Sequence, residues 1–296
     1  MKACPEDRLL RELLKLIPIS SNQPLGPGDD CAALHPPGKN QLLLLKTDCI
    51  AEDVHFLRSH DPARVAWKAL CRPLSDIAAM GGTPGEALIT FFSPPDVSSD
   101  YWLKFYRGLG RAARKFGVTI AGGEMSRQKR GIAVSVALTG SIEKKNLLLR
   151  SGGKPGDAIF VTGVLGGTQA SHHLDFIPRL AEGRWLAKNA RPTAMMDLSD
   201  GLGTDLPRLA QASGCGFEVD FNSIPKRRGA SIHQALCDGE DYELLFTLSP
   251  RKIAKLLEAW PKAFPKTRLS QIGSLISPKT SPANWPQGWD HFNGQV

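Results

Sequence analysis

Strand-like and helix-like segments alternate along both halves of the chain, and this alternation constrains the fold more than any other feature. In the first half, short apolar runs predict strands over 41–48, 85–92, 118–121 and 132–142, and amphipathic stretches predict helices over 62–80 and 99–116. In the second half, strands are expected over 158–162, 193–197, 217–220, 241–248 and 268–276, and helices over 178–189, 203–213 and 250–260. Mixed elements in both halves indicate an α/β or α+β protein of two domains.

A turn-rich cluster separates the two halves. It covers Ser151–Asp157 (SGGKPGD) and follows residues 144–149, where the alternation of expected strands and helices is interrupted. We therefore predict domains at 1–147 and 148–296. The length of 296 residues agrees with about two domains. With 42% hydrophobic and 22% charged residues, the chain can build a sizeable core and is not a disordered protein.

Local signals mark several helix ends. Asp61-Pro62 is typical of an N-cap followed by a first helical residue. Pro73 lies inside the same pattern and is expected to kink or divide the helix. Gly117 follows the next helical stretch and predicts its end. The first 18 residues carry acids among their leucines, so they predict an amphipathic helix and not a signal peptide.

The net charge of +8 is compatible with a solvated surface or with an anionic partner, which could be nucleic acid, a membrane or a phosphorylated small molecule. No segment reaches the roughly 18 apolar residues that cross a bilayer. The six cysteines form no CxxC pair, so reduced thiols are expected and a zinc or disulfide framework is not.

Acidic residues recur beside glycine at turns or at the ends of expected strands. The segments that carry them are Gly28–Asp30, Thr47-Asp48, Ser75-Asp76, Gly122–Glu124, Asp197–Gly201 and Gly239–Asp241. One such residue alone is usually an N-cap or part of an Asx-turn. Six in a basic chain favour a different use, because Mg²⁺ prefers carboxylate oxygens and commonly bridges them to substrate phosphates. His172-His173, by contrast, is predicted to lie on the surface or in a loop.

The common nucleotide-binding and hydrolase motifs are absent. The chain has no GxxxxGK[ST], HExxH or GxSxG sequence. Gly201-x-Gly203 lacks the third glycine of a dinucleotide fingerprint, and Gly108-x-Gly110-x-x-Ala113 falls inside an expected helix. A P-loop fold is therefore excluded, and a dinucleotide-binding fold is disfavoured.

Eight segments, in order, resemble the thiamine-monophosphate kinase family. They are GDDCAAL (28–34), TDCIAEDVHF (47–56), WKALCRPLSDIAAMGGTP (67–84), AGGEMSR (121–127), RSGGKPGDAIFVTG (150–163), MDLSDGLGTDL (196–206), DGEDYELLFT (238–247) and GWDHF (288–292). A single piece such as GDD is weak, but eight in the family's order extend over nearly the whole chain.

The resemblance implies an aminoimidazole-ribonucleotide synthetase-like fold. Its N-terminal mixed sheet would pair in a homodimer, its C-terminal domain would be α/β, and ATP would lie in a cleft with several Mg²⁺ ions. The implied reaction transfers a phosphoryl group from ATP to thiamine monophosphate and yields thiamine diphosphate and ADP. The implied location is cytoplasmic, with no nucleic-acid or membrane partner.

The same resemblance assigns roles residue by residue. It implies that the metal ligands are Asp30, Thr47, Asp48, Asp76, Glu124, Asp197 and Asp200, of which Asp48, Asp76 and Asp200 would act directly in catalysis. The ATP contacts would be Gly123, Glu124, Arg150 and Ser199. The contacts to thiamine monophosphate would be His55, Glu240 and Trp289.

Four positions depart from the family pattern. Glu124 replaces an aspartate, Asp53 replaces a glycine, and Cys49 and Lys46 replace residues that are often small or hydroxylated. Two alternatives stay open beside the kinase. One is a superfamily relative that phosphorylates or activates another acceptor. The other is a non-catalytic nucleotide- or RNA-binding protein that uses the basic clusters at 104–115, 127–130 and 226–228.

Overall fold

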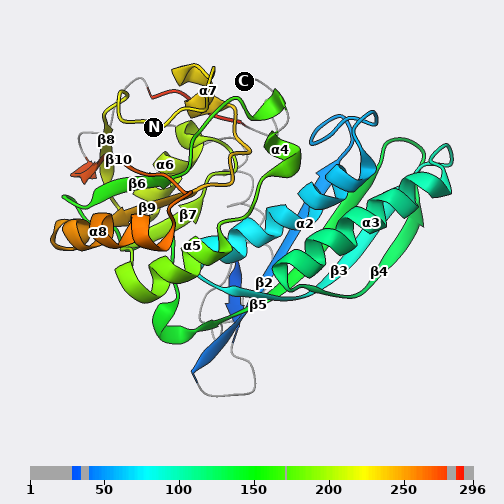
Figure 1. The fold of residues 1–296 in the computed structure, drawn as a ribbon, viewed down its shortest axis with the longest axis horizontal. Helices are drawn as coiled ribbons and strands as arrows, with labels where there is room; N and C mark the ends of the chain where they lie inside the picture. Colours follow the sequence, from blue (N-terminus) through cyan, green and yellow to red (C-terminus); the bar gives the residue numbers. More distant parts are fainter. Residues whose placement is uncertain (1–28, 35–39, 171, 279–284, 290–296) are drawn as a thin grey trace.

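Two five-stranded sheets form the framework of the protein (Figure 1). The computed structural model describes residues 29–34, 40–170, 172–278 and 285–289. The first sheet has the order β1-β2-β5-β3-β4 and comprises β1 (Ala32–Leu34), β2 (Gln41–Ala51), β3 (Thr83–Ser93), β4 (Thr119–Arg127) and β5 (Ala133–Glu143). The second has the order β7-β9-β6-β10-β8 and comprises β6 (Ala158–Thr162), β7 (Ala194–Asp197), β8 (Gly216–Val219), β9 (Leu244–Leu248) and β10 (Leu269–Ile276).

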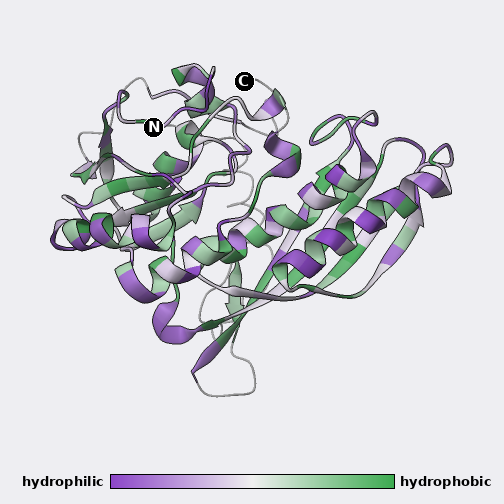
Figure 2. Cartoon of the chain, viewed as in Figure 1, coloured by the Kyte–Doolittle hydropathy of each residue, from purple (hydrophilic) through white to green (hydrophobic). Residues whose placement is uncertain are grey.

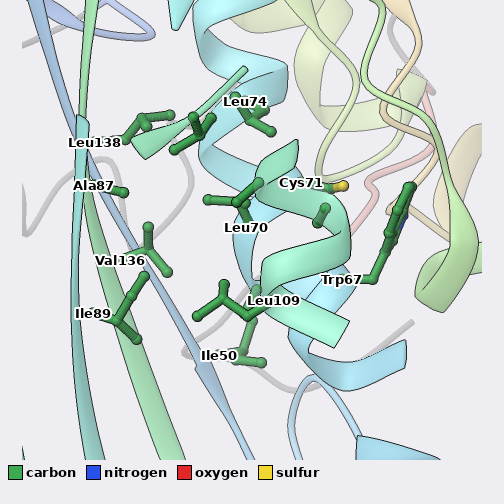
Figure 3. Close-up of a cluster of buried hydrophobic side chains, with 14 of the residues drawn as sticks. Ile50, Trp67, Leu70, Cys71, Leu74, Ala87, Ile89, Leu109, Val136 and Leu138 are labelled. Atoms are coloured by element: carbon green, nitrogen blue, oxygen red, sulfur yellow. The ribbon is translucent and has the colours of Figure 1, made fainter. Parts of the chain in front are cut away.

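The first sheet is mixed, because β3 and β4 run parallel while its other neighbouring strands are antiparallel. Helices α2 (Pro62–Ala79) and α3 (Ser99–Phe116) cover one of its faces (Figure 1). Alternate residues of the central strands are buried on this face. In Figure 3, Val136 and Leu138 point toward Leu70 and Leu74 of α2, which form part of the core of this half.

Helix α2 follows its local signals at the start but not in the middle. Asp61 caps it as predicted, because its carboxylate accepts a hydrogen bond from the Ala63 amide and Pro62 is the first helical residue. Of the two predicted effects of Pro73, division of the helix was wrong, since α2 continues to Ala79, and a kink stays a prediction. Most of α2 from Val65 onward is buried, and packing on several sides stabilises the helix despite the missing backbone donor.

All neighbouring strands of the second sheet are antiparallel. Strands β6 and β9 at its centre are buried along their whole length and are mainly apolar (Figure 2). The helices of this half are α4 (His172–Asp175), α5 (Leu180–Trp185), the π-helix η3 (Leu186–Ala190), α6 (Leu202–Ala212), α7 (Ile232–Cys237) and α8 (Ile253–Ala263). Short 3-10 helices cover η1 (Lys144–Asn146), η2 (Thr168–Ala170) and η4 (Pro250–Lys252).

Several elements differ from the predictions. Strand β4 continues to Arg127, so Gly122–Glu124 lies inside a strand and does not follow it. The sequence did not predict β1, α4 or α7, and β9 begins three residues later than expected. The predicted helix at 1–18 lies outside the described residues. None of the described helices is long and apolar enough to span a bilayer.

Helix α2 belongs to the first half but also packs against the second. It contacts α4, α5 and β7 as well as α3 and strands β2, β3 and β5 (Figure 1). The C-terminal half of α2 carries Asp76, and β7 ends at Asp197. The packing of α2 against β7 therefore brings acidic residues from the two halves together.

Candidate active site

Three buried aspartates meet where the two halves join. Asp30 precedes β1, Asp76 lies on α2 and Asp197 ends β7. One carboxylate oxygen from each lies within 4.8 Å of the others, and the residues are only 2%, 6% and 3% exposed. We call this group the aspartate cluster. Such close burial of three carboxylates is unfavourable unless positive charge compensates it.

Two basic side chains supply part of that charge. Lys46 Nζ lies 2.7 Å from Asp76 Oδ1, and Arg150 Nη2 lies 2.6 Å from Asp30 Oδ1. Burial, together with neighbouring carboxylates, still raises the pKa of Asp197 to about 7 and raises the pKa of Asp76 well above its usual value. Asp30 Oδ2 is buried and has no hydrogen-bond partner among the described residues. This oxygen-only donor set suits a hard divalent cation such as Mg²⁺.

A pocket lies next to the aspartate cluster. Its lining residues are Val54, His55, Arg72, Gln169, Ser199, Asp200, Asp238, Glu240, Tyr242 and Trp289. It contains about 400 Å³ of empty space, part of it open to solvent. Arg72 stands one turn before Asp76 on α2, and its Nη2 atom lies 3.1 Å from Asp48. The pocket and the cluster are therefore parts of one continuous site.

Glu240 is held in the pocket wall by two basic partners. Its Oε1 lies 2.6 Å from Lys68 Nζ and its Oε2 lies 3.2 Å from His173 Nδ1. Burial alone would raise the pKa of Glu240, but these partners lower it to about 2. Lys68 is fully buried, and burial lowers its pKa to about 8 although Glu240 opposes this. We call these three residues the Lys68 network.

The backbone around Glu240 is strained. Glu240 has φ 55° and Tyr242 has φ 51°, a left-handed conformation that residues other than glycine rarely adopt. Lys68 Nζ also donates to the carbonyl oxygen of His55 at 2.5 Å. The ammonium thus joins two parts of the pocket wall, and the network fixes the position of both.

Asp200 connects the pocket to the C-terminal tail. Its carboxylate accepts a hydrogen bond from Arg208, and its carbonyl oxygen accepts one from the Trp289 amide at 2.9 Å. A Cβ at Gly288 would collide with that carbonyl, so a glycine is needed directly before Trp289. Asp205 is fully buried behind Asp200 and accepts a hydrogen bond from the Asp200 amide at 2.9 Å. These contacts place Trp289 at the pocket.

The structure brings most of the predicted site residues together. Asp30, Asp76 and Asp197 form the aspartate cluster, Arg150 contacts it through Asp30, and Asp48 contacts Arg72 beside it. The predicted substrate contacts His55, Glu240 and Trp289 share the pocket with Ser199 and Asp200.

Thr47, Gly123 and Glu124 lie elsewhere. Thr47 follows Lys46 on β2 and so points to the opposite face of the sheet, where its Oγ1 lies 3.5 Å from Ser135 Oγ. Glu124 pairs with Thr90, which pairs with Ser135, so Glu124 shares that outer face. Strands β2 and β4 are separated by β5 and β3, which amounts to about 14 Å. Within one chain, Glu124 therefore does not reach Asp48.

Several residues of the site were not expected from the sequence. His173 was predicted to lie on the surface or in a loop, but it is 4% exposed and belongs to the Lys68 network. Lys68 and Arg72 were part of a recognised motif without an assigned role. Their only signal was a basic residue at each of two positions, one turn apart, on a mainly apolar helix.

Family models describe both halves. Residues 28–142 match the N-terminal domain of AIR synthase related protein, and residues 169–281 match its C-terminal domain. The thiamine-monophosphate kinase of Rhodopirellula baltica is 35% identical over 92% of this chain and 92% of its own length. The enzyme of the same name from Aquifex aeolicus is 34% identical over 90% and 92%, respectively.

A solved structure extends this likeness to three dimensions. The structure of AaThiL complexed with AMPPCP and TMP superimposes with a TM-score of 0.80 at 30% identity, and covers 97% of this chain and 96% of that one. The fold and its buried acidic site thus define a two-domain protein of the AIR synthase related class. Within that class, the chain belongs to the thiamine-monophosphate kinase family.

Proposed function

We propose that this protein transfers the γ-phosphoryl group of ATP to thiamine monophosphate and releases ADP and thiamine diphosphate. The observation that carries the proposal is the continuity of two unlike sites. A pocket with an aromatic side chain, Trp289, opens beside a cluster of carboxylates suited to phosphate-bound cations. The family membership and a relative's complex with AMPPCP and TMP agree with this use.

Asp30, Asp76 and Asp197 would hold Mg²⁺, with Asp48 and Asp200 as further ligands at the edge of the pocket. Bound Mg²⁺ would neutralise phosphate oxygens and so reduce the repulsion between the two anionic substrates. Arg150 lies against Asp30, from where its guanidinium would also reach an ATP phosphate. Ser199 lines the pocket two residues after Asp197 and would contact ATP there.

The pocket would bind the thiamine part of the acceptor. Trp289 is only partly buried and presents a ring on which a heteroaromatic ring could stack. His55 and Glu240 would orient the acceptor, because Lys68 holds the backbone of the first and the carboxylate of the second. An orientation fixed in this way favours in-line transfer.

The acceptor needs no general base. A phosphate monoester has a second pKa near 6, so it is mostly a dianion at neutral pH. Positioning and charge neutralisation would therefore supply most of the catalysis.

We further propose that the protein is a cytoplasmic homodimer without a nucleic-acid partner, paired through the outer face of the first sheet. Leu45 on β2 and Leu88 on β3 are exposed on this face, and Gly123 and Glu124, which are also expected to contact ATP, lie on β4 of the same sheet. In such a dimer, Thr47 and Glu124 would lie at the interface with the second chain. Light scattering of the purified protein would measure the oligomeric state.

The decisive experiment incubates the purified protein with ATP, MgCl₂ and thiamine monophosphate and identifies the products by chromatography. We expect thiamine diphosphate and ADP in equal amounts. Trp289→Leu should raise the KM for thiamine monophosphate and leave that for ATP nearly unchanged. If ATP binds but no thiamine diphosphate forms, the protein acts on another acceptor, which is the second candidate function.

A further inference from the structure

Lys46 is a charged residue that contacts the aspartate cluster and that the proposed reaction does not use. It lies on β2, two residues before Asp48, and its side chain points to the face that α2 covers. Its ammonium nitrogen lies 2.7 Å from Asp76 Oδ1. An ammonium at this distance occupies the position from which a cation would approach the same carboxylate oxygen.

The charges of the cluster do not balance. Asp30, Asp76 and Asp197 contribute three negative charges, and Lys46 and Arg150 contribute two positive ones. The unpartnered atom lies on Asp30, whose Oδ2 is buried without a hydrogen bond within the described part of the chain. Asp76 Oδ1 and Asp30 Oδ1 already have cationic partners, Lys46 and Arg150, so Asp30 Oδ2 is the oxygen left for a further cation. The need for a further cation is therefore greatest on the Asp30 side.

We infer that the Lys46 ammonium is a built-in cation of the aspartate cluster, and that it takes at Asp76 the place of one divalent ion. The cluster then binds one divalent ion fewer than its carboxylates would hold without the lysine. This inference concerns the same site as the proposed function. It predicts the number of bound divalent ions, which can be measured without any enzymatic turnover.

The backbone holds Lys46 in place. It pairs with Leu138 in the middle of the β2–β5 ladder, so its main chain cannot move away from the cluster. The ammonium would have to lose its bond to Asp76 for a divalent ion to bind the same oxygen, and two cations that close would repel each other. A lysine therefore competes directly with a metal ion at this oxygen, whereas a short hydroxyl side chain would not.

The test counts bound Mn²⁺, which prefers the same oxygen ligands as Mg²⁺ and can be followed by electron paramagnetic resonance. Wild type, Lys46→Ser, Lys46→Arg and Lys145→Ser are each titrated with MnCl₂ without nucleotide. Lys145 is exposed and pairs only with Glu143 among the ion pairs of the described residues, so its removal controls for the loss of one positive charge. We expect Lys46→Ser to bind one more Mn²⁺ per chain than wild type, and Lys46→Arg and Lys145→Ser to match wild type.

An unchanged count in Lys46→Ser would overturn the inference. If Lys46→Ser does not fold without metal, its thermal unfolding is measured at increasing MnCl₂ concentrations. Stabilisation of Lys46→Ser by MnCl₂, when Lys145→Ser folds without it, supports the inference.

Wild-type crystals soaked in MnCl₂ give an independent result from anomalous scattering. A manganese peak bonded to Asp76 Oδ1, with Lys46 displaced, would contradict the inference, and a peak on Asp30 with Lys46 still on Asp76 would support it. Failure to form thiamine diphosphate would leave these counts unaffected.

Discussion

The aspartate cluster and the Lys68 network are both buried at the junction of the two halves, yet their carboxyl groups respond to burial in opposite ways. Burial raises the pKa of Asp197 to about 7, whereas Lys68 and His173 lower the pKa of Glu240 to about 2. Glu240 has two basic partners to itself, while three aspartates share two. Both kinds of carboxylate are buried, so burial does not explain the difference. The number of basic partners decides whether the negative charge of a buried carboxylate is already neutralised or needs an added cation.

The largest expected effect concerns the cluster. Asp76→Ala should lower kcat by about two to three orders of magnitude, because it removes a ligand for the cation that neutralises the phosphates. The same is expected for Asp48→Ala. Steady-state assays with ATP and thiamine monophosphate measure the loss, and circular dichroism checks the fold. Asp96→Ala, at an exposed residue, is the control and should retain full activity. Near-normal rates in Asp76→Ala would refute a catalytic cation at this cluster.

Substitutions in the Lys68 network should mainly lower the stability of the protein. Glu240→Gln or Lys68→Met alone should lower the free energy of unfolding by about 3–5 kcal/mol, because each leaves the other charge buried without its partner. The pKa of Glu240 is lowered from 4.5 to about 2, so its contribution is present above pH 4.5 and is lost as the pH falls toward 2.

The double variant Lys68→Met/Glu240→Gln sharpens this test. It removes both charges, so its loss of stability should be smaller than the sum of the two single losses. Urea unfolding at pH 7 measures all three variants. Strict additivity would show that the two residues do not act as a pair.

The secondary structure could be predicted where its signals are local. Asp61 and Ser98 cap α2 and α3, and Gly117 ends α3 in a left-handed conformation, so the ends of both helices follow from neighbouring residues. Strand β4 was cut short in the prediction because Gly122-Gly123 resembles a turn. Its parallel pairing with β3 keeps these glycines extended, and that pairing is not visible in the local sequence. The domain boundary near 147 stays a prediction.

The site was predictable to the extent that motifs carry it. The carboxylates stand in recognisable segments, but the partners that set their charge do not. Lys68 and His173 are 105 residues apart in sequence, and only the packing of α4 against α2 joins them. The alternation along β2 indicates that Lys46 and Asp48 share one face and that Thr47 lies on the other. Which face is covered by α2 depends on tertiary packing.

Bound metal should reverse the sign of the change in stability that a mutation in the aspartate cluster causes. The pKa of Asp197 rises from 3.8 to about 7 on folding, so the folded state binds more protons between these values and the metal-free protein loses stability as the pH rises through that window. Asp197→Asn should therefore raise the unfolding temperature at pH 7.5 in EDTA by a few degrees, roughly the effect of 1–2 kcal/mol.

In MgCl₂ wild type should unfold at a higher temperature than Asp197→Asn, because wild type gains stability from the bound ion and the variant gains less. Glu258→Gln removes an exposed carboxylate and should behave as wild type in both buffers. If Asp197→Asn is less stable than wild type in EDTA as well, the aspartates of the cluster do not repel one another in the way described.

The smallest effect concerns His172, the first of the two adjacent histidines. His173 has an acidic partner, whereas His172 is half-buried near Arg227, and this burial lowers its pKa to about 4. Between pH 6.5 and 4 the unfolded chain binds a proton that the folded one does not, so the protein loses stability as the pH falls. His172→Asn should reduce this acid sensitivity by about 1 kcal/mol at pH 4.5, after allowance for partial exposure. His233→Asn, at an exposed position, should leave the pH dependence of urea unfolding unchanged. An equal effect of both variants would mean that the surroundings of His172 do not disfavour its charged form.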